Sequence, residues 1–376
     1  MENTNLVLGT MNIEYKYSSL SDKSIKNYQD IIQTYISSTD NPILDTAYYY
    51  GNTKTEKVLG DIIHNLSKIP KIATKANPWY DNDFTTGILG QLSKRNLENQ
   101  LTVSLENLKL DKVDIFYLHC PDYKTPINET LEKCDELWRK EKFDYLGISN
   151  FSKDQLKEVI EICDNEKYNQ PVYYQGMYNL ISRKVEEIFP ILDDNHIEFW
   201  GYNPLAGGLL TGKYKNKDLS NNSRFKDNNI YQNIFWKDKI LSNCDEMFNY
   251  LLDAQQGDAQ QGDAQQGDAQ QSDAQQSDAQ QSDAQQSDAQ QSDAQQSDAQ
   301  QSDGVHPHMV EYSLQWLIKY SKLRQNDKII LGVSTKEQLE TNLTIINTDV
   351  NYNKNIVDYL NKIYFKIEDV SPNYYY

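Results

Sequence analysis

The sequence predicts an α/β fold, a (β/α)8 TIM barrel with a long low-complexity loop insertion. Three observations lead to this fold class. Eight short apolar runs bounded by Gly, Pro, Asn or Asp have the character of buried parallel strands. Longer segments with helical spacing alternate with these runs, as in a closed barrel or in a doubly wound open sheet. No G-x-G-x-x-G pattern follows the first run, which weighs against a Rossmann domain and favours the barrel.

The expected strands and helices follow one another along the whole chain. Strands are expected at residues 6–10, 43–46, 71–75, 113–119, 145–149, 172–176, 198–202 and 328–333. Residues 91–108 carry Leu at 92, 97, 101, 105 and 108, close to helical spacing. Thr125-Pro126 puts a proline at a first helical position, and Ser152-x-x-Gln155 has the pattern of a capping box. Helices at 184–192, 310–320 and 336–346 complete the series.

One segment does not fit the barrel pattern. Residues 253–302 are ten consecutive pentads of the form Asp-Ala-Gln-Gln-Gly or Asp-Ala-Gln-Gln-Ser. They contain no apolar side chain larger than Ala and cannot bury a face, so we expect a disordered, solvated loop. A partner-binding tract is the alternative interpretation of such a Gln-rich segment. Residues 1–252 and 303–376 then form a single barrel domain, with 253–302 as its insert.

Charge and composition exclude several classes of function. The net charge of the 376 residues is −18, of which the ten Asp of the insert supply −10, leaving −8 for the rest. An acidic chain without a basic run is a poor nucleic-acid binder. The absence of a run of about 18 apolar residues argues against a membrane span, and the polar N-terminus lacks a signal-peptide core. Four well-separated cysteines without a C-x-x-C pair indicate a reduced, cytoplasmic protein without a metal site.

Ionisable residues stand at the ends of three consecutive expected strands. Asp45, Lys75 and His119 close the second, third and fourth strand, and Tyr48, Tyr49 and Tyr50 follow Asp45 in the next loop. The active sites of barrels lie at the carboxyl ends of the strands. Each residue alone could be structural, but the three together predict a catalytic site on this face.

Two further segments suit a phosphate. Ser334-Thr335-Lys336-Glu337-Gln338 forms a polar turn at the start of the last barrel helix, where free backbone N–H groups and the positive helix end favour an anion. Ala206-Gly207-Gly208 lets the backbone approach a pyrophosphate closely, because Gly lacks Cβ. Lys213 can add positive charge to this site.

The chain resembles the aldo-keto reductases, most closely their branch of aflatoxin-aldehyde and succinic-semialdehyde reductases. The resemblance covers nearly the whole chain except the insert. It is most specific at Ala73-Thr74-Lys75-Ala76-Asn77-Pro78-Trp79 and at residues 203–213, NPLAGGLLTGK. Shorter matches are LDTA-x-x-Y at 44–50, FYLH at 116–119, YQGMYN at 174–179 and GVST-x-x-Q-x-x-x-N at 332–342.

The resemblance implies a catalytic tetrad of Asp45, Tyr50, Lys75 and His119. A hydride added to a carbonyl carbon requires a proton at the carbonyl oxygen, and a phenol whose pKa is near 10 must be tuned to donate it at neutral pH. We expect the Lys75 ammonium to lower the pKa of Tyr50 and Asp45 to hold Lys75 charged and in place. His119 can donate a hydrogen bond to the carbonyl oxygen. Spacing alone leaves the three tyrosines open, and the resemblance selects Tyr50.

The resemblance also implies NADPH as the cofactor, a small aldehyde as the substrate and a homodimer as the assembly. Arg224, in the Ser-Arg-Phe segment at 223–225, is expected to meet a carboxylate of the substrate through its planar fork of donors. Met11 and Trp79 are the other expected substrate-binding residues. The expected cofactor-binding residues are Ser149, Asn150, Gln175, Tyr202, Asn203, Pro204, Leu205, Ala206, Gly207, Gly208, Lys213, Ser334, Thr335, Gln338 and Asn342.

Two other functions remain open at the level of sequence. The barrel also resembles the β-subunits of potassium channels, which would make it a regulatory protein that binds NADP(H). Alternatively, the chain could act as an interaction protein through its Gln-rich insert. The tetrad favours the first interpretation, an NADPH-dependent reductase that converts aldehydes, including carboxylate-bearing aldehydes or dicarbonyls, to alcohols.

Overall fold

The computed structural model describes residues 5–12, 22–82, 87–214, 225–226, 228–254 and 306–375. All of the expected strands and helices fall within these ranges. The expected loop at 253–302 lies outside them except for its first two residues, so its disorder stays a prediction.

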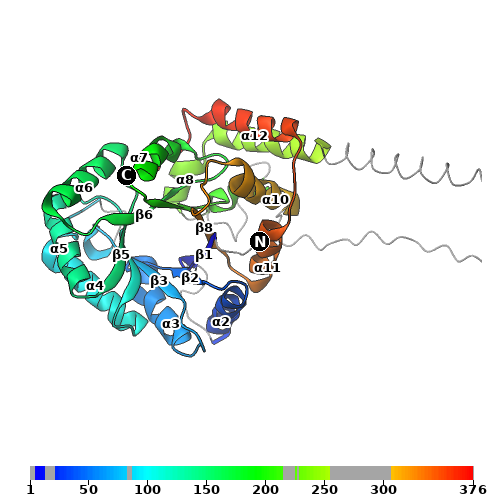
Figure 1. The fold of residues 1–376 in the computed structure, drawn as a ribbon. Helices are drawn as coiled ribbons and strands as arrows, with labels where there is room; N and C mark the ends of the chain where they lie inside the picture. Colours follow the sequence, from blue (N-terminus) through cyan, green and yellow to red (C-terminus); the bar gives the residue numbers. More distant parts are fainter. Residues whose placement is uncertain are drawn as a thin grey trace, which may run out of the picture.

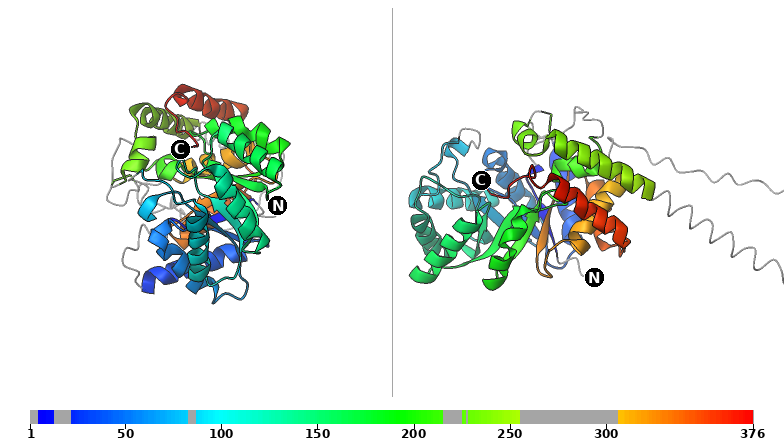
Figure 2. Two further views of the ribbon diagram at one scale, coloured as in Figure 1. Left: turned by 90° about the vertical axis from the view of Figure 1, so that its left-hand side faces the viewer. Right: turned by 90° about the horizontal axis from the view of Figure 1, so that it is seen from above.

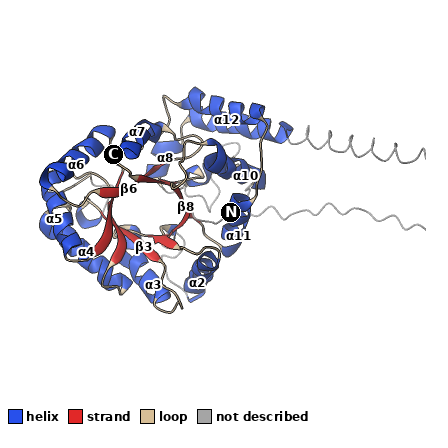
Figure 3. Cartoon of the chain, viewed as in Figure 1, coloured by secondary structure: helices blue, strands red, loops and turns tan. Residues whose placement is uncertain are grey.

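Eight parallel strands form a closed barrel in sequence order (Figures 1 and 3). The ring closes where β1 pairs with β8, with Leu6 opposite Ile329 and Gly9 opposite Gly332. This closure confirms the barrel and excludes the open sheet. The strands are β1 (Leu6–Gly9), β2 (Ile43–Asp45), β3 (Lys71–Ala76), β4 (Val113–Leu118), β5 (Phe143–Ser149), β6 (Pro171–Met177), β7 (Glu198–Tyr202) and β8 (Lys328–Gly332).

Helices surround the barrel on the outside (Figure 2). Helical residues 238–254 lie beside α12, and Tyr250 stacks on Tyr359 between them with ring centroids 3.7 Å apart (Figure 2). The named α-helices are α2 (Asp22–Ser37), α3 (Lys54–Ile63), α4 (Lys94–Leu108), α5 (Ile127–Arg139), α6 (Lys153–Glu166), α7 (Phe189–Asp194), α8 (Asn229–Phe235), α10 (Pro307–Gln315), α11 (Lys336–Asn347) and α12 (Lys354–Ile367).

The starts and ends of the helices follow local chemistry. The expected capping box opens α6: Gln155 N donates to Ser152 Oγ at 3.4 Å, and Ser152 N donates to Gln155 Oε1 at 2.7 Å. The helix expected at 184–192 is divided into a 3₁₀ turn, Lys184–Ile188, and α7. Pro190 accounts for the division, because a proline lacks N–H and fits only in the first turn of a helix.

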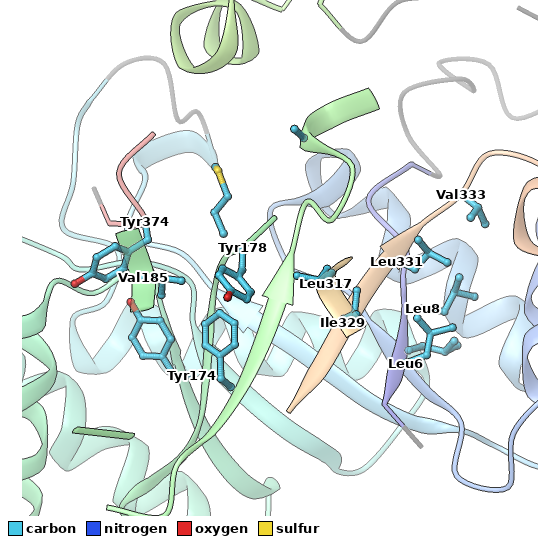
Figure 4. Packing of buried hydrophobic residues seen from close by; sticks show 14 of the residues in the cluster. Leu6, Leu8, Tyr174, Tyr178, Val185, Leu317, Ile329, Leu331, Val333 and Tyr374 are labelled. Atoms are coloured by element: carbon cyan, nitrogen blue, oxygen red, sulfur yellow. The ribbon is translucent and has the colours of Figure 1, made fainter. Parts of the chain in front are cut away.

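The apolar core has two parts, divided by the sheet. Outward-facing strand residues pack against the helices; Leu8, Ile329 and Leu331 belong to this larger part (Figure 4). Inward-facing residues fill the barrel itself, and Tyr117 and Trp200 are the largest of them. Because side chains alternate along a strand, neighbours such as Thr74 and Lys75 point to opposite sides of the sheet. Lys75 points into the barrel, where its Nζ lies 5.8 Å from the ring centroid of Tyr117 in the inner cluster.

Helices α3 and α4 approach each other closely at Gly60. A Cβ added there would lie 2.1 Å from the backbone oxygen of Asn107 and 2.9 Å from Cα of Leu108. Backbone atoms cannot move aside as a flexible side chain can. Only a residue without Cβ therefore permits this spacing of the two helices.

We predict that Gly60→Ala destabilises the protein by about 1–3 kcal/mol, the usual cost of forcing an extra methyl group into a packed core. Denaturant unfolding measures the effect. Gly201→Ala is the control, because a Cβ there meets its nearest atoms at an ordinary 3.4 Å. Equal stability of the Gly60 variant and the parent chain would contradict the observed helix spacing.

Candidate active site

A buried ion pair joins β2 to β3 at the carboxyl end of the barrel. Lys75 Nζ lies 2.7 Å from both carboxylate oxygens of Asp45 and donates to the carbonyl oxygen of Thr46, also at 2.7 Å. The side chains of the pair are 0% and 3% exposed. Gln175, from β6 across the barrel, donates its Nε2 to Asp45 Oδ1 at 2.9 Å. The ammonium and the carboxylate thus satisfy each other with help from two neutral groups.

The loop after β2 is held against β3 by the backbone. Thr46 N donates to the carbonyl of Ala73 at 2.8 Å, and Tyr48 N donates to the carbonyl of Lys75 at 3.0 Å. The chain then turns through Tyr50–Thr53, where Gly51 has a φ of 63° and Thr53 a φ of 69°. Positive φ is costly for a β-branched residue. The turn nevertheless adopts it, which fixes where the tyrosine loop ends and α3 begins.

Three aromatic side chains gather around His119, which follows β4. The ring centroid of Tyr50 lies 5.9 Å from that of His119, and Lys75 Nζ lies 5.2 Å from the Tyr50 centroid. Tyr49 lies 6.3 Å from His119 and 4.9 Å from Trp79, which is itself 5.1 Å from His119. The four residues of the expected tetrad are therefore brought together, with the expected substrate residue Trp79 beside them.

Burial sets the protonation behaviour of the site. It lowers the pKa of Lys75, and the charge and hydrogen bonds of Asp45 oppose that effect. Burial also holds the pKa of His119 well below its usual value, and the nearby Lys75 charge acts in the same direction. His119 is therefore neutral near pH 7. Its Nδ1 is buried and has no hydrogen-bond partner among the described residues.

Residues expected to bind the cofactor at β5, β6 and β7 are connected to this cluster. Asn150 donates its Nδ2 to the carbonyl oxygen of His119 at 2.9 Å and accepts a 2.7 Å hydrogen bond from the hydroxyl of Tyr202. Its φ is 64°, an uncommon conformation that asparagine tolerates better than most residues. Together with the bond from Gln175 to Asp45, these contacts link the two halves of the barrel mouth.

The segment after β7 forms a tight turn beside a lysine. Ala206, Gly207 and Gly208 have φ values of 49°, 67° and 98°. A Cβ on Gly208 would lie 3.3 Å from Cε and 3.5 Å from Nζ of Lys213, so the ammonium sits directly against this glycine. Ala206 N and Gly208 N donate within the turn, to the carbonyl oxygens of Asn203 and Leu205 at 2.9 and 2.8 Å, while the missing Cβ atoms of the glycines allow close approach and Lys213 adds positive charge. This turn therefore fits a phosphate group of a nucleotide cofactor.

The start of α11 is capped by its own residues. Gln338 N donates to Thr335 Oγ1 at 3.2 Å, and Ser334 N donates to Gln338 Oε1 at 2.9 Å. Asn342 is buried one turn further on. The expected residues at this end of the site therefore lie in the cap and the first two turns of α11. Of the other expected cofactor and substrate residues, Ser149 and Pro204 are buried, and Leu205 and Met11 are half-buried.

Some expectations lie beyond what the structure describes. Arg224 is outside the described ranges, so its relation to the pocket stays a prediction. Within those ranges, no group of three His, Cys, Asp or Glu side chains is arranged to hold a metal ion. Among the described helices, none is both long enough and apolar enough to cross a membrane.

The sequence analysis did not identify three residues that shape this region. Tyr117 lies beneath Lys75, whose Nζ is 5.8 Å from the ring centroid, and Gly147 leaves room for that ring. Tyr231 covers Gly207 and donates its hydroxyl to Asn203 Oδ1 at 3.2 Å. Glu56 is fully buried behind β3. Only Glu56 had a sequence signal, because helical spacing puts it on the same face as buried residues three, four and seven positions later.

Comparisons with known proteins place the chain in a family. The model of the aldo/keto reductase family matches residues 5–364. Human aflatoxin B1 aldehyde reductase member 4 is 32% identical over 344 residues, covering 88% of this chain and 87% of the relative. Mouse aflatoxin B1 aldehyde reductase member 2 is 30% identical over 312 residues, covering 80% of this chain and 70% of the relative.

Solved structures share the same barrel. A thermostable aldo-keto reductase in complex with epalrestat superposes with a TM-score of 0.59 at 19% identity, covering 95% of this chain and 94% of the other. An aldo-keto reductase from Klebsiella pneumoniae in complex with NADPH has a TM-score of 0.59 at 17% identity, covering 96% and 90%. The likeness of these structures concerns the fold, whereas the family match spans nearly the whole chain. This chain belongs to the aldo/keto reductase family.

Proposed function

We propose that this protein reduces aldehydes to alcohols, with Tyr50 as the proton donor to the carbonyl oxygen. As an aldo/keto reductase, the chain is an NADP-dependent oxidoreductase that uses NADPH. The observation that carries the proposal is the buried Asp45–Lys75 pair, whose ammonium lies 5.2 Å from the centre of the Tyr50 ring. The names of the human and mouse relatives, aldehyde reductases, support the substrate class.

Lys75 makes the Tyr50 phenol a usable acid. A cation at this distance favours the phenolate that remains after the proton has moved to the carbonyl oxygen. Burial works against the charged form of Lys75, and Asp45 offsets that cost. The bond from Gln175 to Asp45 keeps the carboxylate aimed at the ammonium. These contacts therefore favour the protonated form of Lys75 and hold its side chain in position.

His119 and the aromatic residues orient the substrate. Because burial keeps the imidazole neutral, His119 can donate one hydrogen bond to the carbonyl oxygen without competing with Tyr50 as an acid. Tyr49 and Trp79 flank the imidazole with apolar ring surface. Apolar walls exclude water and strengthen the electrostatic effect of Lys75 on the reacting oxygen.

The other half of the barrel mouth fits the cofactor. NADPH supplies the hydride when it is bound. The Gly207-Gly208 turn, Lys213 and the start of α11 would hold its phosphates and adenosine end, since the glycines lack Cβ, Lys213 carries a positive charge and the positive end of the α11 dipole favours an anion. Asn150, Gln175 and Tyr202 stand between this region and the tetrad. They would place the nicotinamide beside Tyr50.

We predict that Tyr50→Phe lowers kcat by about 10²–10⁴-fold, the usual value of proton donation by a positioned acid. NADPH binding should change little, because the phenol faces the carbonyl rather than the phosphates. Oxidation of NADPH followed by absorbance, with an aromatic aldehyde as substrate, measures the rate. Tyr49→Phe is the matched control. If Tyr49→Phe loses the activity and Tyr50→Phe keeps it, the donor is Tyr49.

We further propose that Arg224 recognises acidic aldehydes. Arg224→Ala should raise KM for succinic semialdehyde or 2-carboxybenzaldehyde by about 10-fold or more, since a hydrogen bond to a charged group is worth about 1.5–3 kcal/mol. Uncharged analogues are the control and should be nearly unaffected. Equal losses for both substrate classes would exclude carboxylate recognition by Arg224.

A further inference from the structure

A second carboxyl group is buried close to the ion pair, on the opposite side of β3. Glu56 lies in the first turn of α3 and has no exposed surface. Thr74 Oγ1 donates to its Oε1 at 2.5 Å, and Ser104 Oγ, from α4, donates to its Oε2 at 2.9 Å. No ion pair with Glu56 is formed within the described residues. Burying a carboxyl group without an ion-pair partner is costly, and the hydrogen bonds from Thr74 and Ser104 offset part of that cost.

The neighbours of Glu56 are parts of the proposed catalytic site. Thr74 immediately precedes Lys75 in β3, so the bond to Glu56 fixes the strand at the residue before the lysine. The charge of Lys75 acts to lower the pKa of Glu56. In turn, the charge of Glu56 acts to raise the pKa of Lys75 and that of Tyr48 in the tyrosine loop. Helix α4 presents only neutral groups to it, Ser104 and Asn107. Lys75 and Tyr48 are therefore the titratable groups that face this carboxyl.

We propose that Glu56 is a positioning residue for Lys75: it anchors β3 through Thr74 and, when ionised, supplies a second negative charge that helps to keep the buried ammonium protonated. This inference rests on the proposed function for its catalytic consequence. Burial lowers the pKa of Lys75 despite the charge and hydrogen bonds of Asp45, and the charge of Glu56 acts in the same direction as that of Asp45. The positive end of the α3 dipole favours the anion at this position.

The proposal gives the enzyme a particular dependence on pH. Burial raises the pKa of Glu56 from 4.5 to about 7, although hydrogen bonds from Thr74 and Ser104 oppose the rise. Below that pH the group is neutral and resembles glutamine; above it the carboxylate supports Lys75. The raised value also means that the folded state loses stability as the pH rises from 4.5 to about 7, because the unfolded chain gives up this proton first.

The test compares the parent chain with Glu56→Gln. We expect the ratio of kcat/KM of the parent chain to that of the variant to be near one at acid pH and to rise to about tenfold on the alkaline side of neutrality, because only the ionised carboxylate supports the protonated form of Lys75. NADPH affinity should be unchanged. Glu106→Gln, at an exposed position on α4, is the control and should give a ratio near one throughout. A Glu56→Gln ratio that does not vary with pH would overturn the proposal.

Thermal stability supplies a readout that does not need turnover. We expect Glu56→Gln to remove part of the fall in Tm between acid and alkaline pH. In a Lys75→Met background the Glu56 contribution to that fall should be larger, since the opposite charge is gone. Equal contributions in both backgrounds would overturn the electrostatic link. An inactive parent chain would instead refute the proposed function, and this cycle would still decide the role of Glu56.

A milder variant covers the case in which Glu56→Gln does not fold. Ser104→Ala removes one donor from the Glu56 carboxylate and leaves its charge in place. We expect the midpoint of the pH-dependent fall in Tm to move to higher pH, because the carboxylate form loses a stabilising donor and the carboxyl group therefore keeps its proton to higher pH. An unchanged midpoint would overturn the proposal.

Discussion

The buried ion pair between Asp45 and Lys75 is the constraint on which the rest of the site depends. Taking each charge out of water costs several kcal/mol, and only good geometry with further hydrogen bonds repays it. Here the carboxylate is bidentate to the ammonium, Thr46 accepts a third bond, and Gln175 reaches Asp45 from the far side of the barrel. Three strands must therefore keep their register for the pair to be satisfied, so the fold and the chemistry are fixed by the same contacts.

The residues at the carboxyl end of the barrel fall into two neighbouring groups. Asp45 and Lys75 lie in β2 and β3, His119 directly follows β4, and the residues proposed to bind the cofactor lie in and after the later strands. Asn150 connects the halves, since it bonds both to the backbone of His119 and to Tyr202. A cofactor held by the second half would thus be registered against the proton donor of the first.

Local patterns predicted most of the fold, whereas contacts between distant residues stayed invisible. Apolar runs located all eight strands, and the ends at Asp45, Lys75 and His119 followed from them. The helix expected from residue 91 begins at Lys94, because the backbone at Ser93 is still extended. The bond from Gln175 to Asp45 joins residues 130 positions apart, and no periodicity encodes it. Tyr231 likewise covers Gly207 and bonds to Asn203, 28 positions earlier in the chain, and spacing alone could not separate Tyr48, Tyr49 and Tyr50.

The pH profile of Lys75→Met is the most direct measurement of whether the buried ammonium tunes the proton donor. We expect kcat to fall by at least about 10²-fold and the remaining activity to show a displaced profile, because the phenol loses the cation that favours its ionised form. NADPH binding, measured by fluorescence, should persist and show that the barrel is intact. A Lys75→Met enzyme with the normal rate and the normal profile would contradict the role assigned to the ion pair.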